Sequence, residues 1–419
     1  MSTLLLILLV IALLLLRQNL FVILGSVTAT VYLLFADEPL SGIILDAWSA
    51  LNKDVLLSIP LYILAGNIMA QGAIADRLVR VMRALTAGVP GGLAMATILS
   101  CALFAAVTGS GTVTLIAIGA VMYPALLEAG YTRRFSLGAL CAAGTLGVII
   151  PPSIPLILYG VMTRTNITEL FVAGILPGLL LTLLMLGYAA WVNRRIPAGE
   201  WSGRELGAAL WSGSWALLMP VLILGGIYSG VFTPTESAAV AVVYAMVVEA
   251  LVYRDLGLAE LGAVMVKTGE LLGSLFPVLM MAFSLNMFLT YQQVPEHMVG
   301  WLGERVTDPV ALILGTNLFL LLVGCLMDIG SAILVLAPIL APLVTDHGIS
   351  LLQFGIIMVV NLEIGYLTPP LGLNLIVAMG VFREDFWTIC RAVLPFVLLM
   401  MLALLTISFI PALSIGLTG

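Results

Sequence analysis

Two short stretches decide the fold of this chain: GTLGVIIPPS at residues 144–153 and GYLTPPLG at residues 365–372. Each combines glycines with two adjacent prolines inside an otherwise apolar segment. A proline removes a backbone N–H donor, and its ring clashes with the preceding helical turn. A continuous helix therefore cannot pass through either stretch, and both helices should unwind there.

The two stretches belong to an internal repeat. The proline pairs at 151–152 and 369–370 lie 218 residues apart. The same offset matches three further pairs: Gly147 with Gly365, Pro124 with Pro342, and Gly130 with Gly348. Agreement at five glycine and proline positions without a gap indicates that one structural unit was duplicated.

The composition around the repeat is that of a membrane protein. Of 419 residues, 62% are hydrophobic and 9% charged, whereas soluble domains average roughly 45–50% and about 25%. Apolar runs long enough to cross a bilayer recur from end to end, which excludes a water-soluble globule. The net charge of −6 excludes the positively charged surface that binding of nucleic acid requires. We interpret residues 3–16 as a retained span, because no basic region precedes them and no cleavage site follows.

Two apolar segments, 91–128 and 309–344, are too long for one crossing. Each is interrupted by small and polar residues, TGSGT at 108–112 and GCLMDIGS at 324–331. Each can form two full spans or a hairpin that enters the membrane and returns on the same side. Both choices leave every following loop on the same side of the membrane, so the charges in the loops do not decide between them.

The basic residues predict the orientation, because Lys and Arg in short loops mark the cytoplasm. With both long segments as hairpins and the N-terminus outside, all Lys and Arg except Lys53, Arg164 and Arg305 fall on the cytoplasmic side. Both termini are then periplasmic. The first hairpin opens toward the cytoplasm and the second toward the outside, so the two units are inverted, as in many secondary transporters.

The sequence thus predicts an all-α polytopic membrane protein with inverted repeats, each with a re-entrant hairpin and a helix broken at Pro-Pro. We divide it into N-terminal scaffold spans (1–55), a first repeat (56–169; hairpin 91–128, broken helix 136–162), further scaffold spans (170–253), a second repeat (271–381; hairpin 309–344, broken helix 351–381) and a final span (392–413).

Unwound backbone at membrane depth persists only where protein buries it or where it lines a hydrated cavity. Free carbonyls together with a few hydroxyls form a hard-oxygen cage suited to Na⁺. Thr108 and Ser110 offer hydroxyls in the first unit, and Thr368 does so in the second. The alternative is that the prolines only kink packed helices.

Asp328 is the other candidate, because a carboxylate inside an apolar segment is costly unless it is used. It could bind substrate, water or an ion, or cap the second helix of its hairpin. Asn361 and Glu363 could support the second break by hydrogen bonds, and Asn374 could face the substrate; structural roles are equally open. No zinc-hydrolase, nucleophile-elbow or P-loop pattern is present, so hydrolysis and direct ATP coupling lack their chemistry.

Three features are expected at the membrane surface. Residues 74–85 should form a helix with a basic stripe on the inner surface, and residues 294–306 could lie similarly on the outer one. Trp201, Trp211 and Trp215 cluster in one predicted loop region, where they would be interfacial anchors or contact a partner subunit.

With these motifs, the chain closely resembles the large membrane subunit of tripartite ATP-independent periplasmic (TRAP) transporters, end to end. The matching stretches are IPLYILAG at 59–66, TGSG at 108–111, residues 147–153 with Tyr159 and Gly160, MDIG at 327–330, NLEIG at 361–365 and TPP at 368–370.

The resemblance implies a permease subunit of a Na⁺-coupled importer for small carboxylate solutes, in which a transport domain carrying both hairpins slides against a scaffold. It implies two partners, a small four-helix membrane subunit and a periplasmic binding protein, in a bacterial or archaeal inner membrane, and no organic cofactor. The alternative is a stand-alone Na⁺- or H⁺-coupled anion symporter or exchanger.

The resemblance also implies site residues. One Na⁺ site would use Thr108, Ser110, Gly147, Ile150 and Pro152, and the other Gly324, Gly365, Thr368 and Leu371, largely through backbone oxygens. Asp328, Ser110 and Asn374 would contact the substrate. Gly330 and Ser331 replace the Pro-Ala common in the family, which predicts a looser tip of the second hairpin.

Overall fold

The computed structural model describes residues 8–9, 12–13, 16, 18, 20–35, 41–294, 297, 299–300 and 308–418. Within these ranges the chain is all helix and loop, without a β-strand, which confirms the predicted all-α fold. Eight of the described helices are long and apolar enough to cross a membrane, or nine if one bent pair counts as a span. The predicted segments 3–16 and 294–306 fall mostly outside the described residues.

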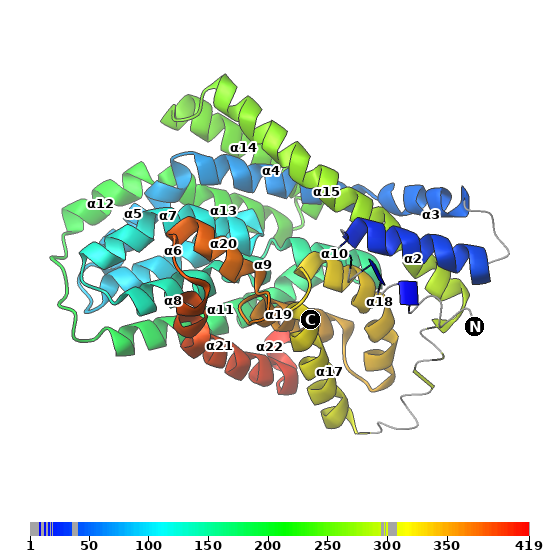
Figure 1. Cartoon of the computed structure of the whole chain (residues 1–419). Helices are drawn as coiled ribbons and strands as arrows, with labels where there is room; N and C mark the ends of the chain where they lie inside the picture. The colour runs from blue at the N-terminus through cyan, green and yellow to red at the C-terminus, as the bar shows by residue number, and fades with distance from the viewer. Residues whose placement is uncertain are drawn as a thin grey trace.

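One group of helices lies along one side of the molecule (Figure 1). The long helix α15 packs against α2 and α3 with its C-terminal half, where Ser284 donates to Ile43 O, and against α4 nearer its start, where Asn67 donates to Thr268. Helix α4 in turn packs closely on α14. The bounds are α2 (Leu20–Phe35), α3 (Ser41–Leu51), η1 (Asp54–Leu57), α4 (Ser58–Gln71), α14 (Pro234–Val247), η2 (Val248–Tyr253) and α15 (Leu258–Tyr291).

Four helices of the first predicted repeat unit align with four of the second under the 218-residue offset, and α9 of the first unit has no separate counterpart. The first has α6 (Gly92–Thr108), α7 (Gly111–Glu128), α8 (Arg133–Gly144), α9 (Leu146–Ile149) and α10 (Ile154–Thr163). The second has α17 (Pro309–Gly324), α18 (Ile329–Asp346), α19 (Leu351–Tyr366) and α20 (Leu373–Phe382). The 218-residue offset maps the first and last residues of α7 onto the first and last residues of α18, and each helix has 18 residues.

Both proline pairs interrupt their helices, as the sequence predicts. Pro151 and Pro152 lie between α9 and α10, and Pro369 and Pro370 lie between α19 and α20. The helix after each break packs against the other unit: α10 lies on α18, and α20 lies on α7. This exchange brings the tips of the two hairpins and the two breaks into one region of the molecule.

Three helices surround this region, namely α11 (Ile167–Val192), α21 (Phe386–Phe409) and the short α22 (Ala412–Ile415). Helix α11 contacts α6, α9, α19 and α21, so it connects the two units. Polar residues set the starts of the helices: Asn166 caps α11 and Asp385 caps α21, each accepting hydrogen bonds from the first-turn N–H groups.

The predicted surface helix at 74–85 is present as α5 (Ile74–Thr86). Its apolar face is buried and packs on α6, whereas Arg80 on the other face pairs with Glu205 of α12 (Gly203–Ser212) at 2.9 Å. Helix α12 bends by 60° into α13 (Ser214–Tyr228). The predicted loop around the tryptophans was wrong for two of them, because Trp211 belongs to α12 and Trp215 to α13.

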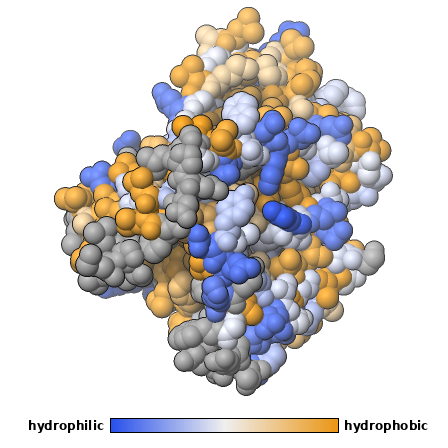
Figure 2. All heavy atoms as spheres, turned by 90° about the vertical axis from the view of Figure 1, so that its right-hand side faces the viewer, coloured by the Kyte–Doolittle hydropathy of each residue, from blue (hydrophilic) through white to orange (hydrophobic). Residues whose placement is uncertain are grey.

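The outer surface agrees with a membrane protein. Figure 2 shows apolar residues over much of the face that it draws, with hydrophilic residues gathered toward its middle. Large apolar side chains are exposed on α11, α13 and α21, among them Leu183, Val221 and Leu398. Such a surface is stable in lipid rather than in water.

Candidate functional site

The tip of the first hairpin is folded tightly onto the first break. Gly109 ends α6 in the left-handed conformation with φ 60°, and Ser110 caps α7 in an extended conformation. A Cβ atom at Gly109 would lie 2.7 Å from the carbonyl oxygen of Pro152. Only glycine fits both the backbone angle and the space at this point.

Oxygen atoms gather behind this tip. The hydroxyl of Thr114 donates to Ser110 O at 2.9 Å, and the hydroxyls of Thr108 and Thr114 lie 3.0 Å apart. Gly147 borders the same cluster, because a Cβ atom there would lie 2.7 Å from Ser110 O and 3.0 Å from the Thr114 hydroxyl. The structure thus brings together Thr108, Ser110 and Gly147. It adds Thr114, which the sequence interpretation missed.

The other two residues predicted for the first sodium site, Ile150 and Pro152, lie in the unwound segment after α9. Helix α11 covers this segment with small residues. A Cβ atom at Gly174 would lie 2.8 Å from Ile149 O, and one at Gly178 would lie 2.8 Å from the Ile150 side chain. Pro151 and Pro152 are therefore buried by protein rather than left in lipid.

At the second break, two glycines meet backbone to backbone. A Cβ atom at Gly365 would lie 2.6 Å from Gly324 Cα, so α17 and α19 cross there without any side chain between them. The N–H of Leu371 donates to Cys325 O at 3.3 Å, and the hydroxyl of Thr368 donates to Ile364 O at 2.8 Å. Gly324, Gly365 and Leu371 thus lie where the hairpin tip meets the second break, and Thr368 bonds within the break itself.

The sequence interpretation expected free carbonyl groups at both breaks, but some of these carbonyl oxygens accept hydrogen bonds within the protein. Ser153 caps α10 and its hydroxyl donates to Val148 O. In the second break, the N–H of Thr368 donates to Gly365 O at 2.9 Å. These two carbonyl oxygens can still contribute a second lone pair to a cation, because a carbonyl oxygen accepts two hydrogen bonds.

Asp328 sits at the tip of the second hairpin as the N-cap of α18. Its side chain accepts from the Ser331 N–H at 2.8 Å and also from the Ser331 hydroxyl. Ser331 thus bonds directly to Asp328 at this cap, and the looser tip stays a prediction. Of the roles considered for Asp328, the structure gives it the capping role, and its carboxylate also borders a cavity.

This cavity, of about 170 Å³, lies between the two hairpin tips. The three residues predicted to contact the substrate, Ser110, Asp328 and Asn374, all line it. Glu363 and Thr112 line it too, and no Lys, Arg or His is found among the described residues of its wall. The remaining wall is formed mainly by glycines and apolar side chains: Gly109, Gly111, Val148, Ile154, Pro155, Leu158, Leu275, Ile329, Gly330 and Tyr366.

Asn361 lies elsewhere, in a buried polar chain between helices. Its amide donates to the Asn317 side chain at 2.9 Å, and Asn317 donates to the Ser408 hydroxyl at 3.0 Å. This chain ties α19 to α17 and α21. Asn361 therefore supports the packing around the second break and does not line the cavity.

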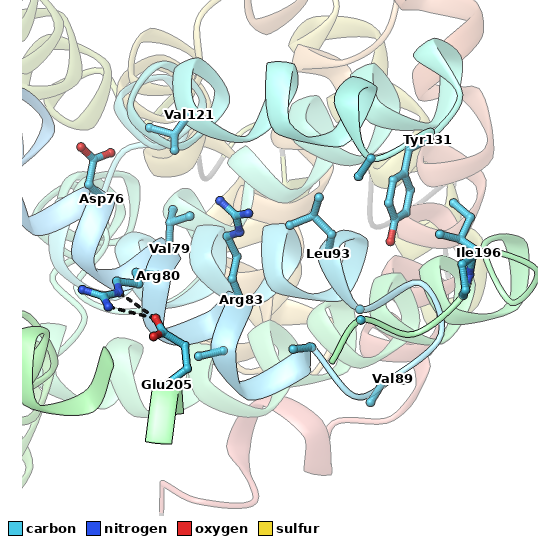
Figure 3. Close-up of a pocket in the computed structure, with 16 residues that line it drawn as sticks. Asp76, Val79, Arg80, Arg83, Val89, Leu93, Val121, Tyr131, Ile196 and Glu205 are labelled. Carbon is cyan, nitrogen blue, oxygen red and sulfur yellow. Dashed lines mark hydrogen bonds and ion pairs between the residues drawn. The ribbon is translucent and has the colours of Figure 1, made fainter. Parts of the chain in front are cut away.

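A larger cavity of about 740 Å³ opens between α5, α6, α7 and the segment before α12 (Figure 3). Arg80 pairs with Glu205 at its edge, and Arg83 and Asp76 also line it. None of the predicted site residues lies in this wall. The smaller cavity is therefore the candidate site, because it alone joins the hairpin tips with buried polar side chains.

Comparison with known proteins agrees with this arrangement. The family model described as the DctM component of the tripartite ATP-independent periplasmic transporter matches residues 7–413. The C4-dicarboxylate TRAP transporter large permease protein DctM of Pseudomonas aeruginosa is 39% identical over 94% of this chain and 93% of its own length. The ectoine/5-hydroxyectoine TRAP transporter large permease protein UehC of Ruegeria pomeroyi is 35% identical over 86% and 85%.

One further relative and one solved structure with a similar fold extend the comparison. The isethionate TRAP transporter permease protein DctMQ of Oleidesulfovibrio alaskensis is 37% identical over 91% of this chain, which spans only 61% of that protein. The crystal structure of the YdaH transporter of Alcanivorax borkumensis superposes with a TM-score of 0.68 at 15% identity, covering 95% of this chain and 97% of that one. The chain therefore belongs to the DctM family, the large permease subunits of tripartite ATP-independent periplasmic transporters, which are membrane transport proteins and not enzymes.

Proposed function

We propose that this chain is the permease subunit of a Na⁺-coupled importer of small organic acids that a periplasmic binding protein delivers. The observation that carries the proposal is the convergence of two hairpin tips and two helix breaks on one cavity. The names of relatives support the solute class, since they include a C4-dicarboxylate and an isethionate transporter. A second membrane subunit fits the longer isethionate relative, of which this chain spans 61%.

The donor atoms at the first break suit Na⁺. No cluster of three or more His, Cys, Asp or Glu side chains occurs in the part of the chain that the structure describes. Oxygens of Thr108, Thr114 and Ser110 crowd together instead, beside Gly147. Neutral carbonyl and hydroxyl oxygens favour a hard monovalent ion over a transition metal.

In this proposal, Na⁺ binding fastens each hairpin tip to its break and so completes the wall of the cavity. The solute then crosses with the hairpins and broken helices of the two repeat units, which move as a transport domain past a scaffold that includes α2, α3 and α14. The reciprocal packing of α10 on α18 and of α20 on α7 supports a common movement of both units. We propose an inner-membrane location with both termini on the periplasmic side.

The test is uptake by the complete transporter in proteoliposomes. The small membrane subunit and the binding protein are reconstituted with this chain. Uptake of a panel of small organic acids, C4-dicarboxylates among them, is measured with an inward Na⁺ gradient or an inward K⁺ gradient. We expect accumulation only with Na⁺. Equal accumulation in both gradients would refute sodium coupling, and accumulation of none of the tested organic acids would refute the solute class.

A further inference from the structure

We propose that Glu363 is the anionic ligand of a monovalent-cation site in the cavity between the hairpin tips, additional to the two sites expected at the breaks. This inference rests on the proposed function, because it concerns the cavity in which the solute would bind. At this site the cation would bind a negatively charged side chain, whereas the two other sites use neutral carbonyl and hydroxyl oxygens.

The first observation is a buried carboxylate without a partner. Glu363, in the last turn of α19, has no exposed surface, and neither of its carboxylate oxygens has a hydrogen-bond partner among the described residues. Glu249 is buried to the same degree in η2 but accepts from the N–H groups of Ala73 and Ile74, each at 2.9 Å. Burial of Glu249 is thus compensated by the protein, and burial of Glu363 is not.

The second observation concerns charge. An unpaired buried carboxylate is costly unless its charge is compensated. The start of α7 is near, because a Cβ atom at Gly111 would lie 3.4 Å from Glu363 Oε1. A helix N-terminus offers only a partial positive charge, which does not balance a full negative one. No described Lys, Arg or His lines the cavity, so the remaining compensation comes from a bound cation or from a proton. Further oxygen donors in the same wall favour the cation, and a protonated Glu363 is the outcome in which Glu363→Gln leaves the ion count unchanged.

The third observation is the presence of further hard oxygen donors in the same wall. Asn374 has no exposed surface, and its Nδ2 atom also lacks a partner. The Thr112 hydroxyl lies 3.3 Å from Asn374 Oδ1. The amide group can be turned over, so that Nδ2 donates to Thr112 and the carbonyl oxygen faces the cavity. A carboxylate, an amide carbonyl and a hydroxyl together favour Na⁺.

A cation at Glu363 explains how an acidic cavity can take an organic acid. Asp328 and Glu363 both line the cavity, and a carboxylate solute would meet two like charges there without a base. A Na⁺ held by Glu363 offsets one of them and offers a positive charge to the solute. Cation binding then precedes solute binding at this site.

The test counts sodium ions bound to the purified complete transporter by equilibrium binding of radioactive Na⁺. Glu363→Gln keeps the shape of the side chain and removes its charge. We expect this variant to bind one Na⁺ fewer than the unchanged protein and to show a lower Hill coefficient for sodium in uptake. The matched control is Glu384→Gln, a buried glutamate that pairs with Arg133 outside the cavity, and it should bind the full number.

The same number of ions in Glu363→Gln and the unchanged protein would overturn the inference. Loss of solute affinity with an unchanged ion count would also overturn it, because Glu363 would then bind a cationic group of the solute. If Glu363→Gln fails to fold, Asn374→Ala should raise the midpoint of sodium binding, and an unchanged titration would overturn the site. Absence of any sodium binding in the unchanged protein would instead refute the proposed function as a whole.

Discussion

Gly147 and Gly365 are positions where a single added methyl group changes the site. A Cβ atom would lie 2.7 Å from Ser110 O in one case and 2.6 Å from Gly324 Cα in the other, and backbone must shift to admit it. Forcing a group into a packed site typically costs about 1–3 kcal/mol. We expect Gly147→Ala and Gly365→Ala to lose most sodium stimulation of uptake, measured per folded transporter in proteoliposomes.

Gly225→Ala is the control for these variants, because a Cβ atom there meets nothing within 4 Å. It should keep both uptake and its sodium dependence. Unchanged sodium stimulation in both Gly147→Ala and Gly365→Ala would contradict a role of the breaks in binding Na⁺.

Asp328 combines a cap with a charge, and two substitutions separate them. Asn caps a helix about as well as Asp, whereas Ala at an N-cap costs about 0.5–2 kcal/mol. We expect Asp328→Asn to fold normally but to lose uptake, and Asp328→Ala to lose uptake and also melt at a lower temperature. Asp385→Ala removes a comparable cap from α21 outside the cavity and should affect melting alone. Full uptake by Asp328→Asn would leave that residue with a structural role only.

Some site residues could be predicted from the sequence and others could not. Ser110, Asp328 and Asn374 drew attention because they are polar within apolar runs, and all three line the cavity. Thr114 was not predicted, because a single threonine within a helix gives no signal of a site. Its contact with Thr108 depends on how the hairpin tip folds. Glu363 was expected only to support the break, because the lack of any partner depends on distant segments.

At the scale of elements, α11 holds the first break in place. Gly174 contacts the unwound segment, where a Cβ atom would lie 2.8 Å from Ile149 O, whereas Gly187 in the same helix has nothing within 4 Å. We expect Gly174→Ala to lower the melting temperature in detergent, with a loss of about 1–3 kcal/mol. Gly187→Ala should be neutral or stabilising by up to about 1 kcal/mol, since alanine favours helix.

A loss for Gly187→Ala as large as that for Gly174→Ala would contradict the assignment of the Gly174 effect to its contact with the break, because Gly187 has nothing within 4 Å. An unchanged melting temperature for Gly174→Ala would mean that the break adapts to α11.

Elements with a strong local signal were predicted well, and those fixed by packing were not. The proline pairs predicted both breaks, and the glycine and polar tips predicted where α6 meets α7 and where α17 meets α18. Helix α3 was missed because its 11 residues are too few for a span. The bend between α12 and α13 was missed as well, because α5 and η2 hold it: Arg77 of α5 donates to Ser212 O and stacks on Tyr253.

At the scale of the whole molecule, contacts between loops agree with the predicted grouping of the basic residues on two sides of the molecule; which side is cytoplasmic stays a prediction. Arg80 reaches Glu205, and Arg134 donates to Arg391 O, so residues predicted on the cytoplasmic side contact one another. Lys53 and Arg164, predicted on the opposite side, also lie near each other. Burial and the charge of Arg164 lower the pKa of Lys53 below its usual range.

The proposal of a three-component importer makes a prediction about the isolated chain. Reconstituted without a small membrane subunit and a binding protein, it should give no solute uptake under an inward Na⁺ gradient, because delivery of the solute is missing. Addition of both partners should restore uptake. Sodium-driven uptake by this polypeptide alone would favour a stand-alone symporter, and the comparison needs only one assay with and without the partners.

Hydrogen exchange in Na⁺ and in choline tests the central claim most directly, because it follows both breaks in the unchanged protein. The account predicts that Na⁺ slows amide exchange in peptides covering 108–114 with 147–153 and 324–328 with 365–372, while α2 and α3 exchange equally in both salts. Equal exchange at both breaks in Na⁺ and choline, in a transporter that is folded and active, would contradict the claim that the two unwound segments bind sodium.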